Sequence, residues 1–220
     1  MTELQFNEIK ERLAKYREIR HLTYENQRKD FLGNVFEKVS KYFRAKDDLE
    51  RVDAVCDIVI FCFNSFDLEF KEMGKIYDYD ATKIIIVDIT DDLTYTTAKF
   101  MRKDFKDFNN IYRLVFNCEH LCKNLGFDFY KCMLETIKEI ESRTGEYNAM
   151  LGKFLKKRGF YSLDEIKKAD LSYLCNNYKI KGISEKENNF IVDLETPSGI
   201  IFNKFPKWYK ADYESCRIEK

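Results

Sequence analysis

The sequence contains very little proline, glycine or histidine. Its 220 residues include two prolines, Pro197 and Pro206, and 8 glycines. The first 196 residues therefore hold no proline, and a chain poor in helix-breaking residues favours long helices. The two histidines, His21 and His120, leave little material for histidine-based catalysis or for a histidine-rich metal site.

Long hydrophobic runs and a disulfide pattern are also absent. The longest apolar run, Ile58 to Phe63, has six residues, whereas a membrane helix needs about 20, so we expect no membrane span. The first residues, Met1 to Gln5, show no basic segment followed by an apolar one, which a secretion signal would require. The seven cysteines are spread singly, which favours a reducing compartment. We therefore expect a cytoplasmic protein.

Neither sign of charge dominates. Lys and Arg number 38, Asp and Glu number 38, and the isoelectric point is near 6.8. Nucleic acids and anionic membranes attract broad positive surfaces, so the composition predicts neither as a partner. An apolar content of 45% is enough for a hydrophobic core, and the length suits one domain with a small appendage.

Apolar residues recur at helical spacing along most of the chain. This periodicity predicts helices over residues 3–20, 26–46, 48–65, 107–124 and 128–143. Asp47 and Asp48 supply capping side chains for the third helix. The β-branched run Ile84 to Val87 fits either a short strand or a buried helical turn.

The character of the sequence changes after about residue 160. Two strand-like runs, Asn189 to Leu194 and Ile200 to Phe205, flank the turn residues Thr196 to Gly199 and predict a β-hairpin. We therefore predict a mainly α protein. A helical bundle over residues 1–158 is followed by a small mixed extension over residues 159–220, whose hairpin packs on the helical domain.

Carboxylates gather on one face of the third predicted helix. Glu50, Asp53 and Asp57 stand at positions i, i+3 and i+7, and the apolar run after Asp57 indicates that this side chain is partly buried. A buried carboxylate needs a metal ion or a cation as partner. Glu37 on the preceding helix joins this group if the two helices form a hairpin, and such a set suits Mg²⁺. The alternative is a salt-bridged face formed with Lys38, Lys41, Arg44 and Arg51.

Three blocks of sequence resemble the MazG-like all-α nucleoside triphosphate pyrophosphohydrolases, in the order of that family. The first block runs over Phe36 to Lys46 and Glu50 to Phe61. The second is Glu135 to Ile140 with Ser142 to Gly145, and the third is Lys207 to Tyr213. The superfamily also contains dimeric dUTPases and phosphoribosyl-ATP pyrophosphohydrolase.

The resemblance implies a helical bundle completed by assembly into a homo-oligomer, a dimer or a tetramer. It implies hydrolysis of a (d)NTP between the α and β phosphates, with a nucleoside triphosphate or another phosphorylated small molecule as the partner. Carboxylates on two successive helices bind Mg²⁺, which neutralises phosphate charge and activates water. Carried onto this sequence, the catalytic positions are Glu37, Glu50 and Asp53, and the metal ligands are these three with Asp57.

The first acidic motif departs from the family pattern. Lys38 and Lys41 stand where the family carries glutamates, so Glu37 alone remains, while Glu50 and Asp53 keep the second motif intact. Two lysines repel Mg²⁺. The interaction between two unit charges about 4 Å apart is about 4 kcal/mol at an effective dielectric of about 20, so replacing carboxylates by ammonium groups turns attraction into repulsion. We therefore expect a degenerate Mg²⁺ site and weakened or lost catalysis.

Two alternatives remain at this point. The protein is either an active Mg²⁺-dependent (d)NTP pyrophosphohydrolase that controls a nucleotide pool, or a non-catalytic nucleotide-binding or scaffold protein. Lysines that point into the acidic cleft favour the scaffold. Lysines in solvent, with another acid such as Glu139 in the cleft, favour the enzyme.

Other residues are candidates for ligand contacts. Lys38 and Lys41 could hold phosphate directly, and the second block adds Lys138 and Arg143 as phosphate-binding residues. The motif Cys118-x-His120-x-Cys122 lacks the usual zinc spacing, and buried thiols are the better interpretation. The aromatic residues Trp208, Tyr209 and Tyr213 are expected to dock the C-terminal segment onto the helical domain.

Overall fold

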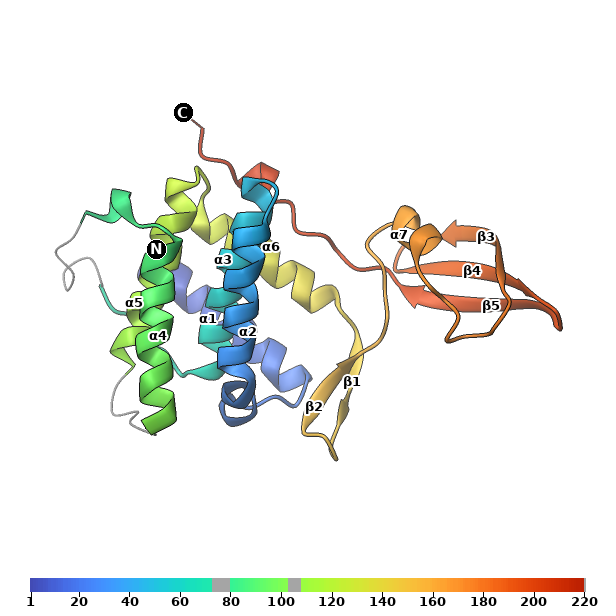
Figure 1. The fold of residues 1–220 in the computed structure, drawn as a ribbon, viewed down its shortest axis with the longest axis horizontal. Coiled ribbons are helices and arrows are strands. Elements are labelled where there is room, and N and C mark those ends of the chain that lie inside the picture. The colour runs from blue at the N-terminus through green and yellow to red at the C-terminus, as the bar shows by residue number, and fades with distance from the viewer. Residues whose placement is uncertain (73–79, 103–107, 220) are drawn as a thin grey trace.

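The computed structural model describes residues 1–72, 80–102 and 108–219 (Figure 1). In Figure 1 a group of helices occupies one side of the molecule and a small sheet occupies the other. The described residues are mainly helical, with antiparallel strands toward the C-terminus, which confirms the predicted fold class.

Six helices form the bundle: α1 (Glu3–Ile19), α2 (Tyr24–Arg44), α3 (Asp48–Ser65), α4 (Ile86–Arg102), α5 (Asn109–Asn124) and α6 (Phe129–Ser142). Polar side chains cap the starts of several. Thr2 and Thr23 each form a reciprocal capping box, and Asp47 accepts a hydrogen bond from the Glu50 amide. The predicted helices therefore exist within a few residues of their expected limits, although position 107 lies outside the described residues.

Helix α3 is the central element of the bundle. Its second half carries the apolar run Ile58 to Phe63, in which most side chains are buried, and it packs against α1, α2, α5 and α6. A helix that is apolar around most of its circumference is stable only when neighbours cover it. This position explains why the polar residues of α3 that remain near the surface face α2 and the C-terminal segment.

The ambiguous run at residues 84–87 leads into a helix. Ile86 begins α4, and Ile84, Ile86 and Ile89 are buried while Ile85 and Val87 are exposed. Threonine hydroxyls along this helix donate to the carbonyls four residues before them, as at Thr90 and the residues after it. Such β-branched residues lower helix propensity, so the helix was not evident from the sequence.

The second part of the chain forms two antiparallel units. A hairpin of β1 (Gly145–Asn148) and β2 (Lys153–Lys156) follows α6, and the short helix α7 (Leu163–Lys168) comes next. Three strands then form a sheet in the order β3 (Lys179–Glu185), β4 (Asn189–Thr196) and β5 (Gly199–Pro206). Thr196 pairs with Gly199, which confirms the predicted hairpin, and Gly199 closes it with φ of 125°.

The bundle and the sheet have separate hydrophobic cores. The sheet core, which includes Phe160, Ile166 and Phe190, fills the space between α7 and the strands. The bundle core extends over α1 to α6 and also includes Tyr213 and Cys216. The C-terminal segment, residues 207–218, therefore leaves the sheet and returns to the helices, as the red trace in Figure 1 shows.

Within the described ranges, no helix combines the length and apolar character needed to cross a membrane.

Candidate functional site

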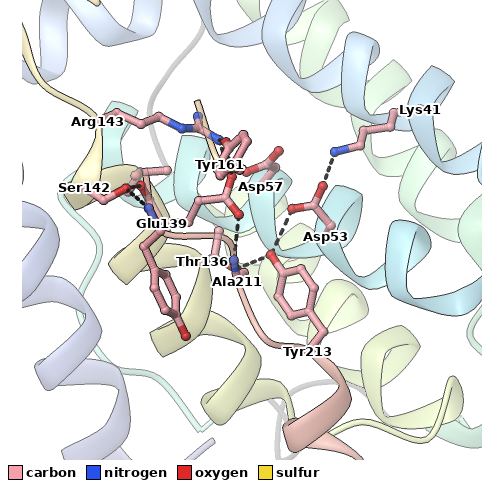
Figure 2. Close-up of polar contacts among 12 residues, drawn as sticks. Lys41, Asp53, Asp57, Thr136, Glu139, Ser142, Arg143, Tyr161, Ala211 and Tyr213 are labelled. Carbon is pink, nitrogen blue, oxygen red and sulfur yellow. Dashed lines mark hydrogen bonds and ion pairs between the residues drawn. The ribbon is translucent and has the colours of Figure 1, made fainter. Parts of the chain in front are cut away.

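A cleft of about 570 Å³ lies where α2, α3, α6 and the C-terminal segment meet (Figure 2). Its lining carries eight carboxylate and four cationic side chains. The cations are Lys38, Lys41, Arg143 and Lys210. The carboxylates are Asp47, Glu50, Asp53, Asp57, Glu139, Glu165, Asp212 and Glu214. The cleft thus contains most of the residues that the sequence singled out.

Two lysines of α2 reach across to two aspartates of α3. Lys41 forms an ion pair with Asp53, and the Nζ of Lys38 lies 3.4 Å from Oδ2 of Asp57. Within each helix the two side chains lie about one turn apart: the lysines are separated by three residues and the aspartates by four. Both lysines therefore point into the acidic cleft, and each of the two aspartates has an ammonium group as partner.

The electrostatics of Asp57 reflect its burial. Loss of water around the carboxylate, and then the charge of Asp53, raise the pKa of Asp57 to about 6, although Lys38 opposes the change. Burial alone would lower the pKa of Lys38, but the carboxylates of Asp57 and Glu37 raise it above its ordinary value. Lys38 is therefore charged at neutral pH and stabilises the ionised form of Asp57.

The other two predicted metal ligands lie apart from this pair. Glu50 accepts a hydrogen bond from the Lys46 amide at 2.9 Å and so closes the turn between α2 and α3, although it still lines the cleft. Glu37 has a side chain that is 65% exposed, contacts Lys38 at 3.1 Å and does not line the cleft.

The donor set at this point does not suit Mg²⁺ as it stands. In the part of the chain that the structure describes, no group of three or more His, Cys, Asp or Glu side chains is arranged to hold a metal ion. Mg²⁺ requires oxygen ligands, and the oxygens of Asp53 and Asp57 already contact ammonium groups.

The opposite wall of the cleft comes from α6. Glu139 accepts hydrogen bonds from the Tyr161 hydroxyl at 2.7 Å and from the Ala211 amide at 3.0 Å, and it forms an ion pair with Arg143. Arg143 also donates to the Tyr161 hydroxyl at 2.7 Å. Glu139 therefore enters the cleft, but its oxygens are already bound by three donors (Figure 2).

The C-terminal segment joins the two walls. The buried Tyr213 hydroxyl lies 2.9 Å from an Asp53 oxygen on α3 and 2.9 Å from the Thr136 hydroxyl on α6. The Tyr209 amide donates to Ser142 at 2.9 Å, and the Tyr209 hydroxyl contacts Glu135. The predicted docking of this segment by its aromatic residues is confirmed for both tyrosines.

The remaining predicted residues fall into two groups. Arg143 lines the cleft, whereas Lys138 pairs with Glu135 on the same helix and is about half exposed. Lys38, Lys41 and Arg143 are thus the three predicted phosphate-binding residues that share the cleft.

The two cysteines of the Cys-x-His-x-Cys motif lie in the bundle interior, whereas His120 is partly exposed. Cys118 and Cys122 are fully buried on α5, and the ring of His120 packs against Phe116 with centroids 4.3 Å apart. This packing agrees with the interpretation of the motif as buried thiols.

The contact of Tyr213 with Asp53 was not predicted. It joins residues separated by 160 positions, and a buried tyrosine near the C-terminus gives no sign of which carboxylate it will contact. Glu139 was named only as an alternative acid, because its position on the inner face of α6 depends on how that helix is rotated.

Comparison with known proteins does not assign the chain to a group: no protein family, no curated protein and no solved structure matches it.

Proposed function

We propose that this chain is a MazG-like protein of the nucleotide pyrophosphohydrolase fold in which metal-dependent catalysis is weakened or lost. The ancestral reaction would be the conversion of a (d)NTP to a (d)NMP and pyrophosphate. In its present form it would be a nucleotide-binding or scaffold protein. The observation that supports this proposal is that Lys38 and Lys41 occupy the cleft and pair with Asp57 and Asp53.

The physical reason is competition for the same oxygens. A Mg²⁺ ion entering the cleft must separate two ammonium groups from their carboxylates and then remain beside them. Two unit charges of like sign repel by about 4 kcal/mol at about 4 Å and an effective dielectric of about 20, and a divalent ion doubles this to about 8 kcal/mol for each ammonium group. Without the ion, a nucleoside triphosphate would face a lining with twice as many carboxylates as cations.

Phosphate binding in this cleft would depend on Lys38, Lys41 and Arg143, three of its four cations. Lys38, Lys41 and Arg143 each contact a carboxylate, so a phosphate group must exchange places with Asp57, Asp53 or Glu139. Such an exchange keeps the cation paired and needs no metal, so binding could outlast catalysis, but it leaves the displaced carboxylate without its cationic partner.

An active Mg²⁺-dependent pyrophosphohydrolase is the second candidate. The observation that favours it is the entry of Glu139 into the cleft, since this carboxylate could replace a missing ligand if Arg143 turned away.

Both candidates include a cytoplasmic location. Both also include a homo-oligomer, either a dimer or a tetramer, as the family resemblance implies.

Calorimetric titration with Mg²⁺ and with a non-hydrolysable dNTP analogue, combined with pyrophosphate release from a panel of dNTPs, tests the proposal. The native protein should take up no Mg²⁺ saturably and release no pyrophosphate. Lys38→Glu combined with Lys41→Glu restores the acidic motif and should produce Mg²⁺ binding.

A control is Lys138→Glu, which makes one such Lys→Glu change at a half-exposed lysine outside the cleft and should leave Mg²⁺ binding absent. Mg²⁺-dependent pyrophosphate release by the native protein, lost in Glu50→Ala, would instead establish the active enzyme.

A further inference from the structure

A second pocket, of about 460 Å³, lies between the end of α1, the end of α6 and the β1–β2 hairpin. Among the described residues, its lining holds three cationic side chains, Lys15, Arg20 and Arg143, and one carboxylate, Glu141. We call it the Arg20 pocket. Arg143 also lines the cleft, so the two pockets share this side chain.

The charge balance of the Arg20 pocket is opposite to that of the cleft. The cleft lining carries eight carboxylates and four cations. In the Arg20 pocket the carboxylate of Glu141 already pairs with Arg12 at 2.6 Å, and Arg12 does not belong to the lining. An anion would therefore meet an excess of positive charge in this pocket, whereas the cleft would oppose its entry.

Arg20 is a buried cation whose partners carry no formal charge. Its exposed fraction is 6%. Within the described residues, its guanidinium donates only to backbone carbonyls, those of Ile140, Glu141 and Arg143, at 3.3, 3.2 and 2.9 Å. These carbonyls end α6 and carry a partial negative charge. They hold Arg20 in place, but a buried charge is normally paired with a full opposite charge.

Part of this guanidinium remains available for a ligand. All three hydrogen bonds start from Nη2 of Arg20. The Nε atom is buried and has no acceptor. Nη1 donates to none of the described residues either, but it is not enclosed as Nε is. Because Arg20 lines the pocket, Nη1 is the nitrogen that an anion there can reach.

Aromatic packing fixes the position of this positive charge. The central guanidinium carbon of Arg20 lies 4.0 Å from the ring centroid of Tyr16 and 5.1 Å from that of Phe154. Gly145 leaves room for Phe154, since a Cβ at this position would lie 2.6 Å from the phenylalanine ring. Burial raises the pKa of Tyr16, and the charges of Arg20 and Arg143 act against this change.

We propose that the Arg20 pocket binds a phosphate group, carried either by free orthophosphate or by a small phosphomonoester. The planar N–H donors of arginine match the oxygens of phosphate, and Arg20 would supply the buried contact. Lys15, which is exposed, would add a point charge at the rim. The pocket has room for a phosphate group and a small organic part.

Arg143 contributes less to this site than Arg20. Its Nη2 already forms an ion pair with Glu139 and donates to the Tyr161 hydroxyl, both on the side of the cleft (Figure 2). The proposal therefore rests on Arg20 and Lys15, which line the Arg20 pocket and not the cleft. It requires neither Mg²⁺ nor the nucleotide chemistry proposed for the cleft.

Titration calorimetry of the full-length native protein tests the proposal. The protein is titrated separately with orthophosphate, with ribose 5-phosphate and with ribose. We expect saturable binding of a phosphate compound and no binding of ribose. Tighter binding of ribose 5-phosphate would identify a phosphomonoester as the ligand, whereas equal affinities would identify free orthophosphate.

Substitutions in the lining locate the bound phosphate. Arg20→Gln removes a charged donor and should weaken binding by about tenfold or more. Because Arg20 is buried, Lys15→Ala serves as a second variant that changes only an exposed side chain, and it should weaken binding about two- to fivefold. A matched control is Lys29→Ala, at an exposed lysine of α2 outside both pockets, which should leave the affinity unchanged.

Two results would overturn the proposal. The first is the lack of saturable binding of either phosphate compound up to about 10 mM. The second is binding that both Lys15→Ala and a folded Arg20→Gln leave unchanged. If Lys41→Ala then abolished this binding, the phosphate would occupy the cleft, so failure of the Arg20 pocket is distinguished from failure of the function proposed for the cleft.

Discussion

The two walls of the cleft neutralise their carboxylates in different ways. On the α3 wall, Asp53 and Asp57 face ammonium groups of the adjacent helix α2, within one helical hairpin. On α6, Glu139 in the cleft and Glu135, which does not line the cleft, rely on amides and hydroxyls of later residues, including Tyr209 and Ala211, for part of their pairing. The α3 wall is therefore paired mainly by local contacts, with one further contact from Tyr213, whereas the α6 wall depends on residues that follow the sheet in the sequence.

The difference shows which features of the site can exist independently. A charge pair between neighbouring helices needs only the α2–α3 hairpin to form. The hydrogen bond from Ala211 to Glu139 needs the C-terminal segment in place. Docking of this segment depends on contacts of Tyr209 and on the buried Tyr213. Changes in the segment should thus disturb the α6 wall and the Tyr213 contact with Asp53, and changes in the lysine pairs should disturb the α3 wall.

The largest effect should follow removal of Tyr213, which contacts both walls. Tyr213→Ala deletes a buried ring and a hydroxyl that contacts Asp53 and Thr136, so it should lower the free energy of unfolding by about 3–5 kcal/mol. Urea denaturation measures this change. Tyr213→Phe keeps the ring and should cost about 1–2 kcal/mol. Equal losses in the two variants would show that the ring contributes nothing to the docking.

A smaller effect should appear in the pH dependence of stability. The pKa of Asp57 is about 6 in the folded protein and near 3.8 in an unfolded chain, so the folded state takes up its proton first as the pH falls. The contribution of Asp57 to stability should therefore rise between pH 7 and pH 4, by on the order of 2–3 kcal/mol. Urea denaturation across this range measures the slope, and Asp57→Asn should lack this part of it.

Asp67 supplies a control of opposite sign. A hydrogen bond from Lys10 lowers the pKa of Asp67, so its contribution is present at neutral pH and is lost as the pH falls through its folded pKa. In Asp67→Asn, the free energy of unfolding should therefore fall less on acidification than it does in the native protein. The same sign of change in both variants would contradict the assignment of Asp57.

The smallest effect should come from the outer contact of the α6 wall. Tyr209→Phe removes the hydroxyl that contacts Glu135 but keeps the ring, so the free energy of unfolding should fall by about 1 kcal/mol. Thermal denaturation is a suitable measurement. Tyr173→Phe, at an exposed tyrosine outside the bundle core, should change stability by less than about 0.5 kcal/mol. If Tyr209→Phe lost as much stability as Tyr213→Ala, the docking of the C-terminal segment would depend mainly on the Tyr209 hydroxyl.

The α3 wall could be predicted from the sequence because its signals are local. Asp47 marks the start of α3, the apolar run marks its buried half, and Glu50, Asp53 and Asp57 follow the helical repeat. Lys38 and Lys41 lie in the preceding helix at the same repeat, so a short connection brings the two sets together.

The contacts of the α6 wall, helix α4 and the hairpin β1–β2 could not be predicted from local sequence patterns. The environment of Glu139 depends on Tyr161 and Ala211, which no periodicity connects with α6. Helix α4 was not evident because its threonines have low intrinsic helix propensity and are held by tertiary packing. The hairpin β1–β2 has strands of four residues each, too short to show a clear alternation of polar and apolar side chains.

The return of the C-terminal segment to the bundle also has a consequence for the order of events during protein synthesis. A ribosome completes α1 to α6 well before it reaches Tyr213 and Cys216, both of which belong to the bundle core. A nascent chain therefore has an incomplete bundle core until Tyr213 and Cys216 emerge from the ribosome. A polypeptide that stops before residue 207 lacks the Tyr213 contacts that join Asp53 on α3 to Thr136 on α6, so the finished cleft forms only after translation has passed this point.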